Sequence, residues 1–489
     1  MFGFNYCLLT GGRGMITNAL FLDLYELTMA QGYFKRQNNR PCVFDMFFRR
    51  NPFKGGYAVL AGLEPLLEAI QAFHFEESDI AYLASLNLFE DEFLDYLKGF
   101  HFSGSVWAMD EGSLIFPSEP ILRVEAPIIE ALFLEGLILN TINFQSLIAT
   151  KTARIWLASG KSSIMEFGLR RAQGQDGAMS ATRASIIGGA AGTSNTLGGK
   201  LYGVPVMGTM AHAWVMSFPS ELEAFEQYAA LYPDKSVFLI DTYDTLGSGI
   251  EAAIKVGKQL QAQGKNFGVR LDSGDMQYLS AEVRKRLDAA GLPDAKIAIS
   301  NELTEEIIES LILNKSPIDS WGVGTHLVTG GQEASFTGVY KLAAHQVAGG
   351  QWQPVMKLSD NPAKITNPGI KQVWRLYDGD GFFKADVVGL HDETIAAGVC
   401  NTYYHPLNDY QSFSFKAAKS EALLHPKITS GAYTGKKESL REMHQRVAGQ
   451  LECLHPTSRR LLNPHIYKVS LTHTLFSLKQ RLLHSLRQE

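Results

Sequence analysis

The chain has 489 residues, of which 45% are hydrophobic and 19% charged, and its formal net charge is −5. This length can hold two or three domains with a large apolar core. The acidic balance argues against a nucleic-acid-binding protein, which usually carries a basic surplus. It leaves room for a small phosphorylated ligand, because such a site needs only a few local cations.

Cysteine usage and apolar patterning indicate a cytoplasmic protein without a membrane span. No apolar run reaches about 18 residues, the length that a spanning helix needs. The first 14 residues, MFGFNYCLLTGGRG, do not resemble a signal peptide because Arg13 follows the apolar part, and Met15 is a candidate start. No CxxC spacing occurs among the four cysteines, so reduced thiols are expected at Cys7, Cys42, Cys400 and Cys453.

The first third of the chain mixes helix and strand signals. Residues 16–36 recur apolar at helical spacing, with Thr17 or Asn18 as the N-cap and Tyr25 near the middle. A strand, a turn and another helix are predicted over 43–63, and a hairpin-rich strand region over 105–124. A long helix is predicted from about Ile128 to Ala158.

From residue 164 the pattern alternates between short apolar runs and helix-length stretches. This alternation predicts parallel βαβ units and favours a (β/α) barrel over an open sheet. The predicted strands are Ile164–Phe167, Val204–Met207, Val237–Ile240, Phe267–Val269, Ile297–Ile299 and Trp321–Val323.

The expected fold class is therefore α/β, with an irregular (β/α) barrel and a second, mixed α+β domain built from both ends of the chain. We expect an N-terminal α+β domain over 1–140 and the barrel over 141–370. Residues 371–489 are expected to pack with the N-terminal domain and to include an amphipathic helix near 471–487.

Each predicted strand of the barrel ends in a polar loop. Because the carboxyl ends of parallel strands form the active face of α/β folds, these loops should converge. In chain order they read EFGLRRAQGQDG, GTMAH, DTYDT, RLDSGD, SNE and GVGTH.

Two of these loops suit anions. In GVGTH, Gly322, Gly324 and Thr325 can form a phosphate nest of backbone N–H groups and a hydroxyl, although a simple turn is the alternative. Arg270, on an apolar strand, should hold a carboxylate or a phosphate, unless it forms an internal ion pair with Asp272.

Other charged residues leave alternatives open. Asp272 and Asp275, like Asp241 and Asp244, can bind ribose hydroxyls or hold Mg²⁺ through water, and Asp241 and Asp244 can equally be helix N-caps. The remaining cations can face phosphate or lie on the surface, and they are Arg170, Arg171, Lys341 and Lys357.

With these loops assembled, the chain resembles the nicotinate phosphoribosyltransferase family. The similar stretches run in order over most of residues 16–370. They are LYELTMAQGYF (24–34), FRRNPFKGGYAVLAGL (48–63), NFQSLIATKTARI (143–155), EFGLRRAQGQDGAMSATRAS (166–185), GTSNTLGGKLYGVPVMGTMAH (192–212), FLIDTYDT (238–245), GVRLDSGD (268–275), GVGTHLVT (322–329) and GVYKL (338–342).

The resemblance implies a type II phosphoribosyltransferase fold, a homodimer with shared active sites, and a reaction in NAD salvage. Nicotinate and phosphoribosyl pyrophosphate would give nicotinate mononucleotide and pyrophosphate, coupled to ATP hydrolysis. His212, which on sequence alone could be a core histidine, matches the family's phosphorylated histidine, and the phosphoryl donor would need Mg²⁺.

The same resemblance implies roles for the other site residues. Thr209 and Arg270 would hold the nicotinate carboxylate, and Asp272 would hold ribose hydroxyls and stabilise positive charge. Tyr25, from the partner subunit, and Phe167 would cover the two faces of the pyridine ring. The phosphate and pyrophosphate groups would meet Arg170, Ser273, Gly274, Gly322, Gly324 and Thr325.

Three other functions compete with this interpretation. Related nicotinamide enzymes carry an acid where this chain has the neutral Asn195, which favours a carboxylate substrate here. A sugar-phosphate lyase or isomerase should show a Schiff-base lysine or paired catalytic carboxylates, and neither stands out. A non-enzymatic descendant of the fold would be expected to lose His212 or Arg270, and both are present.

Overall fold

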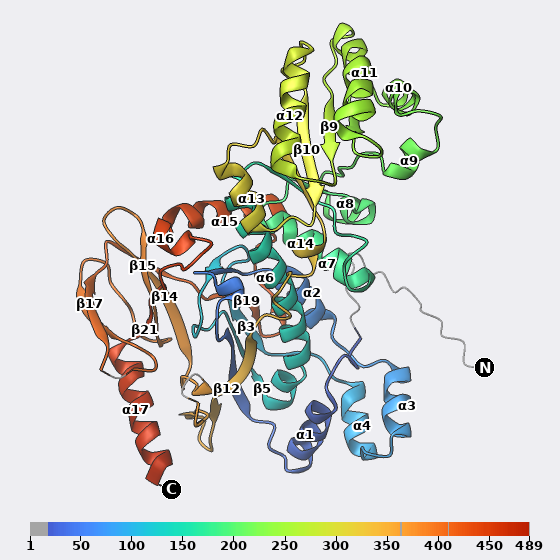
Figure 1. Cartoon of the computed structure of the whole chain (residues 1–489). Coiled ribbons are helices and arrows are strands. Elements are labelled where there is room, and N and C mark those ends of the chain that lie inside the picture. The colour runs from blue at the N-terminus through green and yellow to red at the C-terminus, as the bar shows by residue number, and fades with distance from the viewer. Residues whose placement is uncertain (1–17, 362–363, 409, 489) are drawn as a thin grey trace. The chain divides into compact units, whose positions relative to one another are not determined.

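The computed structural model describes residues 18–361, 364–408 and 410–488 (Figure 1). The expectations for residues 1–14, for Thr17 and for Cys7 lie outside these ranges. The contacts divide the chain into two units. We call Lys151–Ala334 the central unit, and the described residues up to Thr150 and from Ser335 onward the terminal unit.

The central unit is built on a six-stranded parallel sheet in the order β7-β6-β11-β10-β9-β8. Apolar residues with β-branched and aromatic side chains form the short buried strands. Helix α12 packs against β9 and β10, and α11 packs against α12 and α10 (Figure 1). The strands are β6 (Ser163–Glu166), β7 (Gly192–Thr193), β8 (Val237–Leu239), β9 (Gly268–Leu271), β10 (Lys296–Asn301) and β11 (Ser320–Val323).

The helices of the central unit alternate with these strands, as the periodicity predicts. They are α7 (Gly174–Gly188), α8 (Thr196–Tyr202), α9 (His212–Met216), α10 (Glu221–Leu231), α11 (Ile250–Ala262), α12 (Met276–Ala289), α13 (Glu305–Leu313) and α14 (Thr325–Val328), with a π-helical turn at Thr245–Gly249. Among the residues of this unit, no strand pairing joins the edge strands β7 and β8, so the barrel is irregular.

One predicted strand of the barrel is wrong. Val204–Met207 forms a single parallel bridge, between Val206 and Thr193, instead of a buried strand. Val206 is 51% exposed, so this segment lies at the edge of the sheet. The short β7 strand, which the sequence analysis missed, is made of Gly192 and Thr193 and carries no apolar run that could have signalled it.

The terminal unit joins both ends of the chain, as expected for the mixed α+β domain. Its antiparallel seven-stranded sheet has the order β13-β12-β1-β5-β3-β19-β20, so three strands from the first part of the chain lie together between strands from the later part. These strands are β1 (Pro41–Phe48), β3 (Ser105–Ala108), β5 (Leu122–Pro127), β12 (Gly338–Gln346), β13 (Trp352–Pro354), β19 (His425–Thr429) and β20 (Ala432–Tyr433).

A second, mixed sheet of six strands belongs to the C-terminal part of this unit, and helix α17 packs against two of its strands. Its order is β17-β16-β21-β15-β14-β18. The strands are β14 (Lys371–Tyr377), β15 (Phe383–Leu390), β16 (Cys400–Tyr404), β17 (Ser412–Lys416), β18 (Lys419–Ala422) and β21 (Val469–Leu471), and β2 (Ala58–Val59) pairs separately with β4 (Leu114–Ile115).

The helices of the terminal unit include the start of the long helix α6, which continues into the central unit. They are α1 (Leu24–Lys35), α2 (Leu63–Ala72), α3 (Glu77–Ser85), α4 (Asp91–Lys98), α5 (Ile128–Leu132), α6 (Glu135–Ala158), α15 (Leu440–Cys453), α16 (Pro456–Arg459) and α17 (His473–Gln488), with a 3₁₀ turn at Pro52–Lys54.

Several boundaries differ from those predicted. The first helix begins at Leu24 with Asp23 as N-cap, because Asn18 instead accepts a hydrogen bond from the Leu20 N–H in a preceding turn. Tyr25 therefore lies in the first turn of α1 and not near its middle. The predicted barrel domain, 141–370, is longer than the central unit because β12 and β13 join the sheet of the terminal unit.

One helical stretch, Ile128–Ala158, is long and apolar enough to cross a membrane by length and composition alone, although no span is expected from the sequence. In the structure 67% of the most apolar 18 residues of this stretch is buried inside the protein. Packing in the protein interior therefore explains why the stretch is so apolar. The thiols of Cys42, Cys400 and Cys453 are free, as expected.

Candidate active site

The carboxyl ends of β6, β8, β9, β10 and β11 bring most of the predicted site residues to one edge of the central sheet. Parallel pairing places these ends side by side. At each end an apolar, buried strand gives way to a polar loop, so the backbone leaves the core where the side chains become hydrophilic.

Arg270 is the centre of this cluster. Its neighbours Val269 and Leu271 point into the core, and strand alternation turns Arg270 to the opposite face. The guanidinium donates through Nη2 to Asp272 Oδ1 at 2.7 Å and through Nη1 to Thr209 Oγ1 at 2.8 Å. Arg270 therefore forms the internal ion pair with Asp272, and it also contacts Thr209. Binding of a carboxylate or a phosphate by Arg270 stays a prediction.

Ser300 connects the same two charged groups. Its hydroxyl accepts from Arg270 Nε at 2.6 Å and donates to Asp272 Oδ1 at 2.5 Å. Burial alone would raise the pKa of Asp272, but the hydrogen bonds from Ser300 and Arg270 and the charges of Arg270 and His212 outweigh it, so the pKa is lowered. Asp272 is thus a carboxylate at neutral pH.

His212 is the first residue of α9, and its side chain is 40% exposed. Its Nδ1 lies 3.2 Å from Thr242 Oγ1, and its Nε2 lies 3.7 Å from Asp272 Oδ2. The first contact is a hydrogen bond and the second an electrostatic approach. The structure therefore places this histidine beside Asp272, where it is accessible, and not in the apolar core.

Asp241 differs from the neighbouring aspartates. Its Oδ2 accepts from the Asp272 N–H at 2.9 Å and from Ser273 Oγ at 2.6 Å, whereas its Oδ1 is buried without a hydrogen-bond partner in the described chain. Asp244 and Asp275 are helix N-caps, with Oδ1 accepting from the N–H of Gly247 and Tyr278 respectively. The N-cap alternative is thus correct for Asp244 and wrong for Asp241.

The aromatic and glycine residues pack against this cluster. The Phe167 ring centroid lies 5.8 Å from Arg270 Cζ. A Cβ on Gly322 would come within 2.7 Å of the Phe167 ring and 3.1 Å of Ser300 Cβ, so a side chain at 322 would displace both. Gly274 has φ of +88°, a conformation that favours glycine in the turn after Asp272.

The predicted phosphate nest has an acidic neighbour. Thr325 begins the short helix α14 directly after Gly324, and its Oγ1 donates to Glu302 Oε1 at 3.3 Å. His326 Nε2 lies 3.3 Å from the other oxygen of the same carboxylate. A phosphate at Thr325 would have to displace this carboxylate, so the phosphate role of Thr325 stays a prediction.

The other predicted cations are not part of the Arg270 cluster. Arg170 and Arg171 are exposed in the turn before α7. Lys341, in the terminal unit, lies 3.3 Å from Glu135 Oε1 and also donates to the Tyr340 carbonyl. Lys357 is exposed in a loop after β13. Phosphate binding by these residues stays a prediction.

Asn195 is hydrogen-bonded within the central unit. Its side chain is buried, and Oδ1 accepts from the Gly198 N–H at 3.0 Å as the N-cap of α8. Its Nδ2 donates to Thr182 Oγ1 at 3.1 Å. Both ends of the amide are thus used inside the protein, and the effect of this neutral residue on the choice between a carboxylate and an amide substrate stays a prediction.

Tyr25 belongs to the terminal unit, where it is 46% exposed on α1. Partial burial, the charges of Glu135 and Glu26, and a hydrogen bond with Glu135 raise the pKa of its phenol, which is therefore neutral at physiological pH. Its predicted stacking on the pyridine ring stays a prediction.

Sequence reasoning missed the roles of Ser300, Thr242 and Glu302. All three lie in strand-end loops that the sequence analysis singled out, SNE and DTYDT. Small polar residues are common in such loops, so only the distances to Asp272, His212 and Thr325 reveal which of them matter.

The class of protein follows from the architecture. A central irregular barrel and a mixed domain assembled from both ends of the chain form the type II phosphoribosyltransferase fold, as predicted. The solved structure of human nicotinic acid phosphoribosyltransferase has this fold and matches with a TM-score of 0.84 and 32% identity, covering 94% of this chain and 99% of the human one.

Family comparisons agree along most of the chain. The N-terminal domain model of nicotinate phosphoribosyltransferase matches residues 20–143, the family model 162–406 and the C-terminal domain model 370–479. The nicotinate phosphoribosyltransferase of Bacillus subtilis is 40% identical over 474 residues, which is 96% of each chain. One from Mycobacterium tuberculosis is 44% identical over 377 residues, 77% of this chain and 79% of its own.

The chain belongs to the nicotinate phosphoribosyltransferase family. Membership supports phosphoribosyl transfer in NAD salvage and implies nicotinate and phosphoribosyl pyrophosphate as substrates.

Proposed function

We propose that the chain joins nicotinate to phosphoribosyl pyrophosphate in a reaction coupled to ATP hydrolysis through a phosphorylated His212. The observation that carries this proposal is the position of His212, accessible at the end of the parallel sheet and in contact with Thr242 and Asp272. With Nδ1–H donating to Thr242, Nε2 keeps its lone pair and is the nucleophile.

The coupling step balances as follows. Nε2 attacks the γ-phosphorus of ATP, an N–P bond forms, the bond to the bridging oxygen breaks and ADP leaves. Water later cleaves the N–P bond, releasing phosphate and restoring the imidazole. The net reaction is the hydrolysis of one ATP for each nicotinate mononucleotide formed.

In the transfer step the nicotinate ring nitrogen attacks the anomeric carbon as pyrophosphate leaves. We assign Arg270 and Thr209 to the nicotinate carboxylate, because they form a hydrogen-bonded pair 2.8 Å apart. Asp272 is held ionised by Ser300 and Arg270 and would stabilise the positive charge that develops on the ribose. Phe167, with Tyr25 from a partner subunit, would cover the pyridine ring.

The donor set is compatible with Mg²⁺ held partly through water. No group of three or more His, Cys, Asp or Glu side chains that could hold a metal occurs in the described residues. Mg²⁺ commonly needs only one or two carboxylates beside substrate phosphates and waters. Asp241, with its unpartnered Oδ1, and Asp275 would hold it, and the ion would neutralise charge on the reacting phosphates.

We further propose a homodimer with shared sites in the cytoplasm. Supporting a dimer, the N-terminal region exposes four large apolar side chains on or next to α1, which are Phe21, Leu24, Tyr25 and Met29. The exposed free thiol of Cys400 supports a reducing compartment.

The first experiment is product formation from phosphoribosyl pyrophosphate with nicotinate or nicotinamide, each with and without Mg-ATP. We expect nicotinate mononucleotide, formed faster with ATP. Label from γ-³²P-ATP should appear as an acid-labile phosphoprotein, be lost in His212→Ala and be retained in His326→Asn, the other histidine of the central unit. Turnover of nicotinamide alone, or label that survives His212→Ala, would contradict the proposal.

A further inference from the structure

Tyr25 of the terminal unit combines an exposed side chain with a tethered hydroxyl group. The residue is 46% exposed, so it is accessible to a ligand. Its hydroxyl is hydrogen-bonded to the Glu135 carboxylate. Burial, the charges of Glu135 and Glu26, and this hydrogen bond raise the pKa of the phenol, so the phenol keeps its proton and is the donor. The ring therefore cannot change its orientation without losing the hydrogen bond.

The acceptor, Glu135, has a fixed place in the fold. It is the first residue of the 24-residue helix α6, and its side chain is only 13% exposed. The unpaired N–H groups and the dipole at this end of a helix favour a carboxylate. Tyr25 and Glu135 both belong to the terminal unit, so the hydrogen bond joins two helices of one unit.

Lys341 of β12 holds the same carboxylate. Its Nζ lies 3.3 Å from Glu135 Oε1 and donates to the Tyr340 carbonyl at 2.7 Å. Tyr340 is itself buried, stacks on Phe44 with ring centroids 4.8 Å apart, and donates to the Ala131 carbonyl at 3.1 Å. Glu135 is thus joined to the core of the unit by an ion pair, and it holds Tyr25 in turn.

Packing alone does not require this arrangement. A half-exposed tyrosine can form its hydrogen bond with water, and a contact surface between two copies of the chain needs only apolar area. The exposed neighbours Phe21, Leu24 and Met29 supply such area without a polar group. A hydroxyl tied to a mostly buried carboxylate adds a fixed orientation, which matters where one aromatic ring has to stack on another.

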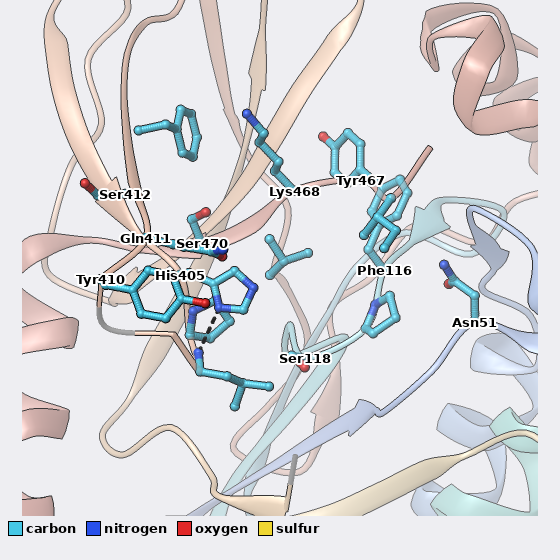
Figure 2. A pocket seen from close by; sticks show the side chains of 16 residues that line it. Asn51, Phe116, Ser118, His405, Tyr410, Gln411, Ser412, Tyr467, Lys468 and Ser470 are labelled. Carbon is cyan, nitrogen blue, oxygen red and sulfur yellow. Dashed lines mark hydrogen bonds between the residues drawn. The ribbon is translucent and has the colours of Figure 1, made fainter. Parts of the chain in front are cut away.

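The Tyr25 side chain is presented outside the cavity of the terminal unit that Figure 2 shows. This cavity has a volume of about 610 Å³ and is lined, among others, by Phe116, His405 and Lys468. Tyr25 and Glu135 are not among the 16 described residues that line it. Tyr25 is therefore available to a ligand that a second molecule of the chain helps to hold.

We propose that Glu135 is a positioning residue for nicotinate, because it fixes the Tyr25 ring in the orientation that stacks on the pyridine ring. The inference rests on the proposed function, in which Tyr25 from a partner subunit covers the pyridine. Glu135 acts through Tyr25 and has no substrate contact of its own. A ring that is already held before nicotinate arrives loses less conformational freedom on binding, so nicotinate binds more tightly.

The test is steady-state kinetics of nicotinate mononucleotide formation at saturating phosphoribosyl pyrophosphate and Mg-ATP. Tyr25→Phe keeps the ring and removes the hydroxyl, whereas Glu135→Ala removes the acceptor. Each should raise KM for nicotinate about two- to tenfold and leave kcat nearly unchanged, because the stack stabilises bound substrate and transition state alike. Adding Tyr25→Phe to Glu135→Ala should raise KM no further, since both changes remove the same hydrogen bond.

A conservative variant and a matched control separate positioning from a general structural effect. Glu135→Gln should keep most of the original affinity, because its amide oxygen still accepts from the Tyr25 hydroxyl. Glu90→Ala removes an ion pair with Lys35 at the other end of α1, and it should leave KM unchanged. Light scattering after gel filtration would verify that each variant has the mass of the original chain.

The outcomes distinguish this inference from the proposed function. No nicotinate mononucleotide from the original chain would contradict the proposed function and the inference with it. Product from the original chain together with an unchanged KM in Tyr25→Phe would overturn the inference alone, and this variant keeps the test valid if Glu135→Ala fails to fold. A further rise of KM in the double variant, or an equal rise in Glu135→Gln and Glu135→Ala, would also overturn it.

Discussion

At the scale of single residues, the Arg270 cluster works through shared partners. Asp272 receives hydrogen bonds from both Ser300 and Arg270, and Ser300 in turn accepts from Arg270. Each of these side chains therefore fixes the orientation of the other two. The Ser300 hydroxyl thereby sets the geometry of Arg270 and Asp272, the two charged groups that we propose to contact the substrates.

Ser300→Ala should lower kcat/KM for nicotinate by roughly ten- to a hundredfold, because hydrogen bonds to charged groups contribute about 1.5–3 kcal/mol. Steady-state kinetics of purified protein would measure the loss. Ser310→Ala, an exposed serine on α13, is the matched control and should leave the kinetics unchanged. Equal kcat/KM in Ser300→Ala and the original chain would show that the hydrogen bonds of Ser300 with Arg270 and Asp272 do not contribute to catalysis.

Glu26, in the terminal unit, predicts a pH-dependent stability. Burial, followed by the charges of Glu135 and Asp23, raises its pKa from 4.5 to about 7. Between pH 4.5 and about 7 the folded chain binds more protons at Glu26 than the unfolded chain does. The contribution of Glu26 to the free energy of unfolding is therefore fully present below pH 4.5 and is lost as the pH rises through about 7.

Glu26→Gln should remove this part of the pH dependence. Urea unfolding monitored at several pH values from 5 to 8 would compare the slopes of the two chains. Glu77→Gln, an exposed acid on α3, is the control that should keep the original slope. An unchanged slope in Glu26→Gln would show that this carboxyl is ionised in the folded protein.

At the scale of elements, the C-terminal end of α6 is joined to α13 in the central unit by buried charges. Glu305, the first residue of α13, accepts from Arg154 Nε at 2.8 Å and also binds Lys151 Nζ. Burial alone would raise the pKa of Glu305, but the two cations outweigh it and lower the pKa. The stability that this group contributes is present above its ordinary pKa and is lost as the pH falls.

Glu305→Ala should destabilise the central unit by about 3–5 kcal/mol, because two buried cations lose their common carboxylate. Chemical unfolding followed by Trp fluorescence would report it, since Trp321 is fully buried in β11. The neighbouring exposed Glu306→Ala should change stability little. A loss of less than about 1 kcal/mol in Glu305→Ala would mean that the cations find other partners.

At the scale of the whole molecule, the exposed apolar side chains around α1 predict self-association. Leu24 is 51% exposed, and Leu24→Asp should shift the chain from dimer to monomer because a carboxylate would be buried in the interface. Light scattering after gel filtration would measure the mass. Leu313→Asp, at a more exposed leucine on α13, is the control, and a dimer that survives Leu24→Asp would place the interface elsewhere.

The sequence by itself determined the alternating βα pattern, the class of the fold and the loops in which the candidate site lies. These follow from local periodicity and from the rule that parallel strands end at a common edge. The stretches shared with the family further pointed to Arg270, Thr209 and His212 as candidate site residues. In the structure Arg270 donates to Thr209, and His212 lies beside Asp272.

Only the tertiary structure decided the roles that depend on contacts between segments distant in the chain. It assigned Asn195 to a helix cap, left Asp241 Oδ1 unpartnered, and made Ser300 the link between Arg270 and Asp272. It also placed β12 and β13 in the terminal unit. The local sequence pattern predicts whether a residue is buried and which element it belongs to. Its hydrogen-bond partners depend on how distant elements pack against one another, which the local pattern does not encode.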